Sequence, residues 1–357
     1  MKHLLSILFF LFTLPVFAQE LAKGAESAEA FNPGEVILHH VADSHEWHRF
    51  STDNGNLVSY FPIIAYQPGK GMSVFSSEKV AEGKSYQNFK LEEEHLATLD
   101  GSTVYDFSIT KNVAALIMSS LVLVIVFTSV ARGYRRRVGQ APTGLQSFLE
   151  PFVVFIRDEV AKKSIGPKYE RYMPYLLTVF FFIWFNNLLG LTPGAANLTG
   201  NVAVTAMLAI LTLIVTLFSS NKAYWSHIFW TPGVPLWLRP IMIPVELASV
   251  FIKPISLTIR LFANITAGHI IILSFISLIF IFRSPWTGFL SVPFGLFISV
   301  LELLVSILQA YIFTLLTAMY IGGAMEEHHH DEDLGIAEQS HGGSDLGHLT
   351  RPDVAAH

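Results

Sequence analysis

Five apolar stretches, each long enough to cross a lipid bilayer, follow one another after residue 110. They cover about 112–131, 174–191, 199–219, 241–282 and 290–321. A hydrocarbon core about 30 Å thick takes about 20 helical residues, and within lipid only helices and closed barrels satisfy every backbone polar group. Only 14% of the residues are charged, whereas soluble domains carry roughly 25%. The sequence therefore predicts an all-α polytopic membrane protein with about five crossings.

The last two stretches are longer than one crossing requires. A helix over 241–282 would be about 60 Å long at 1.5 Å per residue, about twice the thickness of the bilayer core. Such helices have to tilt strongly, bend or protrude, and Pro244 and Pro254 can bend the first of them. We therefore expect two long tilted helices at the C-terminal end of the membrane region.

A further helix is predicted between the first two crossings. Its apolar residues recur at helical spacing, with polar residues between them: Leu145, Phe148, Leu149, Phe152, Ile156 and Val160. This pattern is typical of an amphipathic helix lying along the cytoplasmic membrane surface. Packing in a soluble domain is the weaker alternative, because the chain offers no other sizeable domain.

The N-terminus has the layout of a secretory signal. A basic start, a short apolar core and small residues before Ala18 predict a signal peptide over 1–18, with an uncleaved anchor helix as the alternative. The mixed polar segment 19–110 would then be exported, followed by the membrane domain 111–325 and a cytoplasmic His-rich, acidic tail 326–357.

Charge placement agrees with that orientation. A basic cluster, Arg132, Arg135, Arg136 and Arg137, follows the first crossing directly, as the positive-inside rule requires of a cytoplasmic loop. Five crossings place the C-terminus in the cytoplasm and leave only Arg283 in a short outside loop. We expect a multi-pass protein of the bacterial inner membrane with its N-terminus outside.

Sequence patterns for metal or nucleotide binding are weak. The exported segment clusters four histidines, His39, His40, His45 and His48, but their spacing fits no strong ligand pattern and suits a solvated surface. The same holds for the histidines of the tail. Cysteine is absent, as are phosphate-loop and dinucleotide fingerprints. We therefore expect no metal site, no cofactor, no nucleic-acid partner and no enzymatic site on this chain alone.

Ionisable side chains are rare in the last two stretches, and they follow the helical repeat. Glu246, Lys253 and Arg260 are seven residues apart and share one stripe, which Asn264 continues. His269 falls on the opposite side of the same helix.

The final stretch has a polar stripe of its own, made by Glu302, Ser306 and Gln309. If the two long helices form a hairpin, Arg260 lies at the depth of Gln309 and His269 at the depth of Glu302. Each polar contact within a membrane is worth only about 0.6 kcal/mol.

An arginine in the bilayer costs at least about 2.5–3.5 kcal/mol, so a structural contact does not account for Arg260. The His269–Glu302 pair can be structural, or it can relay protons, because both groups titrate near physiological pH when perturbed. Arg260 stays charged and acts as a fixed positive field. The chain has no carboxylate at the depth of Arg260 on an opposing surface, which suggests that another subunit supplies it.

Several motifs carry a resemblance to a known family. SLTIRLFANI (256–265), AGHIII (267–272) and LQAYIFTLLTAMYI (308–321), with parts of 148–158 and 174–190, resemble the a subunit of rotary proton-translocating ATP synthases. The resemblance covers about 105–325 and does not extend to the exported segment.

That resemblance implies a function. Arg260 would be the stator charge that faces the carboxylate of each passing c subunit, with Gln309 beside it and Asn264 and Glu246 lining two half-channels. The c ring, the b-subunit peripheral stalk and the rest of the synthase would be partners. His269 and Glu302 are exchanged relative to many bacterial members, which keeps one imidazole and one carboxylate at the same depth.

Three questions stay open on the sequence. Sodium is not excluded as the coupling ion. A secondary transporter would show two internal repeats, and none is visible. A membrane-anchored assembly or sensor protein would explain the exported segment and the tail, but it would leave the paired polar depths unexplained.

Overall fold

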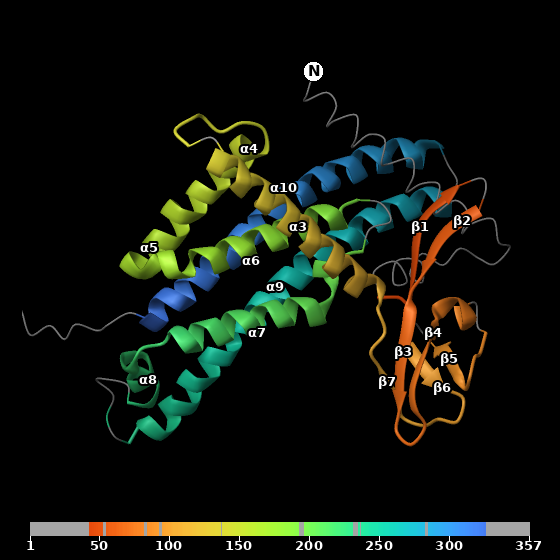
Figure 1. The fold of residues 1–357 in the computed structure, drawn as a ribbon, viewed down its shortest axis with the longest axis horizontal. Coiled ribbons are helices and arrows are strands. Elements are labelled where there is room, and N and C mark those ends of the chain that lie inside the picture. The colour runs from red at the N-terminus through yellow and green to blue at the C-terminus, as the bar shows by residue number, and fades with distance from the viewer. Residues whose placement is uncertain are drawn as a thin grey trace, which may run out of the picture.

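The computed structural model describes residues 43–325 apart from 53, 54, 82, 83, 93, 94, 137, 193–195, 231–234, 236, 283 and 284. The predicted signal peptide, the tail, His39, His40, Arg137 and Arg283 therefore lie outside the described residues. Two parts are visible in Figure 1, a bundle of long helices and a small β domain beside one end of it.

Five helices of the described chain are long and apolar enough to cross a membrane, which confirms the predicted number of crossings. The helices in chain order are α3 (Lys111–Arg136), α4 (Leu145–Phe155), α5 (Lys162–Ile165), α6 (Tyr169–Gly190), α7 (Val202–Ser219), α8 (Lys222–Phe229), α9 (Arg239–Phe282) and α10 (Pro285–Met325). A π-helical segment η3 (Ile156–Ala161) joins α4 to α5, and the short 3-10 turns η4 (Gly166–Lys168) and η5 (Leu198–Gly200) precede α6 and α7.

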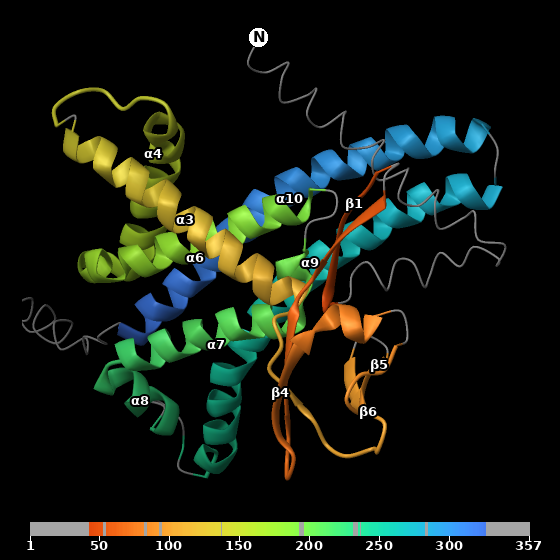
Figure 2. The same ribbon diagram turned by 45° about the vertical axis from the view of Figure 1, so that its right-hand side comes forward.

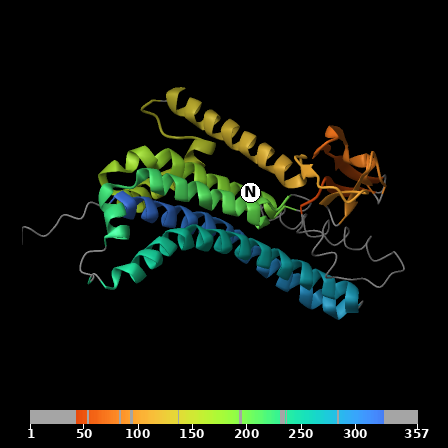
Figure 3. The same cartoon turned by 90° about the horizontal axis from the view of Figure 1, so that it is seen from below.

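The two long C-terminal helices form one pair. α9 and α10 run side by side, with α6 packed along α10 and α7 along α9 (Figure 1). Seen from below, α9 and α10 lie together on one side of the other helices, and α9 bends along its length (Figure 3). Pro254 lies within α9 and provides no backbone N–H for the helix ladder. The bundle therefore covers one face of this pair and leaves the other face open.

Aromatic and branched side chains fill the core between α6, α9, α10 and the α4–η3 segment. Leu176 and Ile183 of α6, Leu261 of α9 and Phe313 of α10 are completely buried in it. The rings of Phe152 and Trp184 pack between α4 and α6 with their centres 4.6 Å apart and their planes tilted by 50°. Burying such a side chain stabilises a fold by about 1.5–3 kcal/mol in water, but between helices in lipid the gain comes from close packing.

The predicted amphipathic helix is present as α4 and η3, and its apolar stripe meets two surroundings. Leu149, Ile156 and Val160 are buried in the core of the bundle, whereas Leu145 and Phe148 are more than half exposed. The stripe therefore packs largely on the membrane helices themselves. Close packing continues at α5, where a Cβ added to Gly322 of α10 would collide with the Ser164 carbonyl oxygen.

The segment before α3 folds into short antiparallel strands, which our sequence analysis did not predict. They are β1 (Glu46–Thr52), β2 (Gly55–Tyr60), β3 (Pro62–Gln67), β4 (Gly71–Ser76), β5 (Phe89–Glu92), β6 (His95–Thr98) and β7 (Tyr105–Asp106), with a 3-10 turn η1 (Ser77–Lys79). β1 pairs with β2, β5 pairs with β6, and the third sheet has the order β4-β3-β7. Ile63, Ala65, Phe75, Phe89 and Leu96 belong to its small core.

Candidate functional site

The α9–α10 pair brings His269 and Glu302 together, which the sequence analysis placed at the same depth. His269 Nδ1 lies 3.6 Å from Glu302 Oε1. This distance suits an ion pair but exceeds that of a hydrogen bond. Glu302 is only 7% exposed, and neither of its oxygens has a hydrogen-bond partner among the described residues. The carboxylate fits here because position 268 is glycine, and a Cβ there would collide with Glu302 Oε1.

At the depth of Gln309, the observed contact differs from the pairing with Arg260 that the sequence suggests. Asn264 Nδ2 donates a hydrogen bond of 2.6 Å to Gln309 Oε1, and Gln309 is buried. Arg260 lies one helical turn before Asn264 and is exposed, so Gln309 is bonded to Asn264 and not to Arg260. Within the described residues, the Arg260 guanidinium forms no hydrogen bond and no ion pair. A permanent charge is thus held at an exposed position of α9.

Buried polar atoms without protein partners continue from Glu302 along α10. Ser306 is completely buried and its hydroxyl is unbonded within the described chain, as is Gln309 Nε2. Asn187 of α6 donates a hydrogen bond of 3.2 Å to the Ser306 carbonyl oxygen, while its own Oδ1 has no partner there. A buried polar group without a partner costs about 1–3 kcal/mol. Such a cluster suits hydration or proton transfer better than structural packing.

Asn187 is a site residue that our sequence analysis did not select. The signal was present, because two adjacent asparagines, Asn186 and Asn187, interrupt the apolar run 179–191. Asn186 bonds to the Phe182 carbonyl oxygen of its own helix at 2.7 Å. Only Asn187 reaches across to α10, which the sequence alone does not reveal.

The remaining predicted site residue, Glu246, lies at a separate polar cavity of about 240 Å³. Ser249 and Lys253 line this cavity with Glu246 from α9, Tyr224 and His227 line it from α8, and Tyr320 from α10. Glu246 and His269 are 23 residues apart, or about 35 Å along a helix. Arg260 lies between them in sequence, so the chain has a polar site on each side of the fixed charge.

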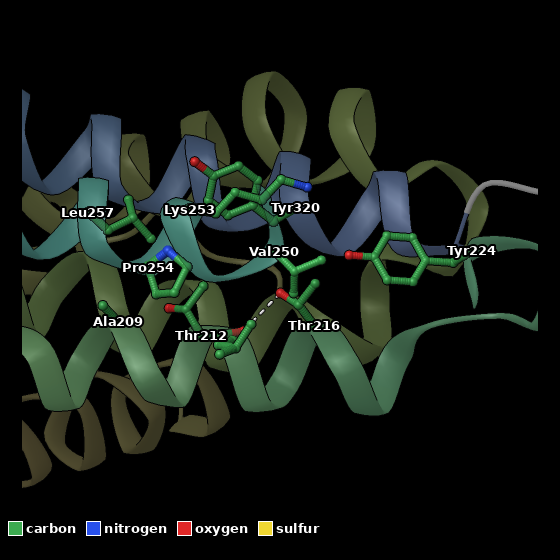
Figure 4. Close-up of a pocket in the computed structure, with 10 residues that line it drawn as sticks. Ala209, Thr212, Thr216, Tyr224, Val250, Lys253, Pro254, Leu257 and Tyr320 are labelled. Carbon is green, nitrogen blue, oxygen red and sulfur yellow. Dashed lines mark hydrogen bonds between the residues drawn. The ribbon is translucent and has the colours of Figure 1, made fainter. Parts of the chain in front are cut away.

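A smaller and mostly apolar cavity adjoins this one between α7, α9 and α10. It has a volume of about 10 Å³, which is near the space that one water needs. In Figure 4, Thr212 and Thr216 of α7 lie on one side, opposite Lys253 and Tyr320. The Lys253 ammonium lies 5.3 Å from the centre of the Tyr320 ring. Lys253 and Tyr320 line both cavities.

Ligands for a metal do not gather in the described part of the chain, where no three His, Asp or Glu side chains come together. His45 instead lies 2.9 Å from Asp106 Oδ2. Burial alone would raise the pKa of Asp106, but hydrogen bonds from His45 and Ser108 outweigh it and lower this pKa to about 2. His45, one member of the predicted histidine cluster, thus contributes a contact to the β domain.

Fold and site together define a class: a multi-pass helical membrane protein whose two longest helices carry ionisable groups at several depths, as ion-translocating proteins do. A family model described as ATP synthase A chain matches residues 114–322, and a model of a domain of unknown function matches 36–115.

Curated relatives agree with that match. The chain is 46% identical over 326 residues to an ATP synthase subunit a from Pelodictyon phaeoclathratiforme, covering 89% of this chain and 84% of the relative. It is 46% identical over 240 residues to the one from Chloroherpeton thalassium, covering 65% and 72%. It is also 39% identical over 329 residues to the one from an Anaeromyxobacter species, covering 88% and 76%.

The chain belongs to the ATP synthase subunit a family. The resemblance drawn from the arginine motif is thereby confirmed, and with it the prediction that this is the proton-channel subunit of an ATP synthase membrane sector. The other subunits of an ATP synthase complex follow as its partners.

Proposed function

We propose that Arg260 is the stator charge of this synthase and faces the carboxylate of each passing subunit of a c ring. The observation that carries the proposal is the exposure of Arg260 on α9, without an ion-pair partner in the described chain. A fixed guanidinium there would keep an opposing carboxylate ionised, because an opposite charge within about 4–6 Å favours the charged form.

Two half-channels follow from the polar sites on either side of Arg260. The His269–Glu302 pair, with Ser306, Gln309 and Asn187, would pass protons between the outside and the ring. The cavity at Glu246 would connect the ring to the cytoplasm, and Asn264 lies at the level where the two approach Arg260. Because one charge crossing 100 mV releases about 2.3 kcal/mol, a direct leak between the two would dissipate the driving force, and Arg260 would block it.

The orientation is part of the proposal. α3 ends in Arg135 and Arg136, and Lys162 and Lys163 lie in α5. All four belong to the connection between the first two crossings, which the positive-inside rule assigns to the cytoplasm. The N-terminal segment would be exported behind a signal over 1–18, and the C-terminal tail would lie in the cytoplasm of a bacterial inner membrane. A b-subunit stalk would hold the chain still against the ring. Nucleotide chemistry belongs to other subunits of the complex.

Cross-linking tests whether the open face meets a c ring. The chain has no cysteine, so Ile259→Cys, whose native side chain is 58% exposed beside Arg260, gives a unique thiol. Ile117→Cys on α3, where isoleucine is 57% exposed, is the matched control. With a c subunit carrying one cysteine near its carboxylate, oxidation should give an adduct for Ile259→Cys alone. An adduct formed equally by Ile117→Cys, or by neither, would contradict the proposed face.

A further inference from the structure

The β domain leaves one apolar sheet face uncovered. Side chains that alternate along β3 and β4, and along β7 and the residue that follows it, lie on one exposed face: Tyr66, Met72, Val74, Tyr105 and Phe107. Met72 is 69% exposed, Val74 63% and Phe107 66%. The rings of Tyr66 and Tyr105 pair across β3 and β7 with their centres 6.3 Å apart. No charged side chain of these three strands lies on this face, since Asp106 pairs with Ala65 on the core side.

This domain is fastened to the start of the first membrane helix. The Asp43 carboxylate accepts hydrogen bonds from the Asn112 backbone N–H at 3.1 Å and from the Thr110 hydroxyl at 2.9 Å. The Lys111 N–H donates to the Ser44 carbonyl oxygen at 2.8 Å. Phe107 is four residues before α3 begins, so it lies within about 14 Å of the helix start even in an extended chain. The sheet is thus held at the membrane surface.

The uncovered face is turned toward the helical bundle. In Figures 1 and 2 the β5–β6 hairpin lies on the side of the β4-β3-β7 sheet that is turned away from the bundle. Phe89 and Leu96 of that hairpin pack with Ile63 and Phe75, which fixes the core side of the sheet. The opposite face, with its two tyrosines, therefore faces the side on which the helices enter the bilayer.

We propose that this face binds the outer surface of the lipid bilayer, so that the exported domain rests on the membrane beside α3. Tyrosine is enriched at membrane–water interfaces because its ring is apolar and its hydroxyl is hydrated. Met72, Val74 and Phe107 would enter the boundary between headgroups and acyl chains, in continuity with the exposed apolar surface of α3. A contiguous apolar patch of this kind marks a binding surface in a soluble domain. Here the nearest apolar phase is the bilayer to which the domain is fastened.

Site-directed spin labelling in the assembled complex tests this proposal. Val74→Cys and Met72→Cys place a label on the face, and His95→Cys on β6 places one on the far side of the domain. The complex is reconstituted in lipid nanodiscs, and the accessibility of each label to oxygen and to a water-soluble nickel chelate is measured. ATP-driven proton pumping by each variant confirms that the complex has folded and assembled.

We expect the oxygen-to-nickel accessibility ratio at positions 72 and 74 to exceed the ratio at position 95 several-fold. Access to nickel at all three positions would place the face in water and overturn the proposal. Shielding from both reagents at positions 72 and 74 would mean that protein covers the face, either a second copy or another subunit, and would overturn it as well. Neither result depends on how protons cross the membrane domain.

Discussion

His269 and Glu302 lie 3.6 Å apart across α9 and α10, and Glu302 reaches that position over the backbone of Gly268. The contact joins the imidazole of His269 to the carboxylate of Glu302. It requires glycine at position 268, because any side chain there would occupy the space of the carboxylate.

Gly268→Ala should therefore impair proton transport while the helices still assemble. The added Cβ forces Glu302 or α9 to move, and overpacking of this kind costs about 1–3 kcal/mol. We expect ATP-driven pumping in inverted membrane vesicles to fall by about tenfold or more, which corresponds to 1.4 kcal/mol or more in a barrier. Gly295→Ala on α10 is the control, because a Cβ there meets no atom within 4 Å. Equal loss in both variants would point to a general packing defect instead.

Proton flux should tolerate an exchange of His269 and Glu302 better than the loss of either side chain. His269→Ala or Glu302→Ala removes one titrating group and should slow proton flux and shift its pH dependence. The double variant His269→Glu with Glu302→His keeps one imidazole and one carboxylate in contact and should recover flux relative to either half of the exchange. Flux is measured as dye-reported acidification of vesicles over a range of pH. Unchanged flux in both alanine variants would reduce the pair to a structural contact.

Substitutions of the two adjacent asparagines of α6 should differ in their effect on proton flux. Asn187 reaches Ser306 of α10, whereas Asn186 bonds within its own helix. Asn187→Leu should lower proton flux because it removes a polar group from the buried cluster beside Glu302. Asn186→Leu should leave the flux near that of the wild type. If the two variants pump alike, the cluster is not part of the proton path.

The β domain should lose stability in acid through Asp106. Its pKa in the folded domain is about 2, below the value near 3.9 of an unfolded aspartate, so its stabilising effect is complete above pH 4. The effect is lost as the pH falls from about 4 through 2, and it amounts to at most about 2–3 kcal/mol. Hydrogen exchange of β3 and β7 in the intact complex should accelerate over this range. Asp106→Asn should exchange faster at neutral pH and lose the acid response; an unaltered profile would exclude the pair as its cause.

Much of the membrane domain was predictable because lipid restricts what a chain can do. The apolar stretches set the five crossings, and the fixed rise of a helix placed His269 opposite Glu302. The same reasoning paired Arg260 with Gln309, but side-chain contact depends on rotation as well as depth. Asn264, one turn further along α9, makes the bond instead.

Other parts of the fold and of the candidate site could be recognised only in the tertiary structure. The cavity at Glu246 is completed by Tyr224 and His227 of α8, whose position no pattern in the sequence specifies. The β domain has strands of two to seven residues in a polar segment, too short for a clear alternation signal. Its apolar face is recognisable only once β3, β4 and β7 are placed side by side.

The role of Arg260 is tested most directly by ATP-driven proton pumping in inverted membrane vesicles with a pH-sensitive dye. Arg260→Ala and Arg260→Lys are compared with the wild type and with Ile259→Ala, an exposed neighbour on α9. If Arg260 is a positioned stator guanidinium, pumping is lost in both arginine variants and kept in Ile259→Ala. Pumping retained by the lysine variant would mean that any positive charge suffices. Pumping retained by Arg260→Ala would contradict the account.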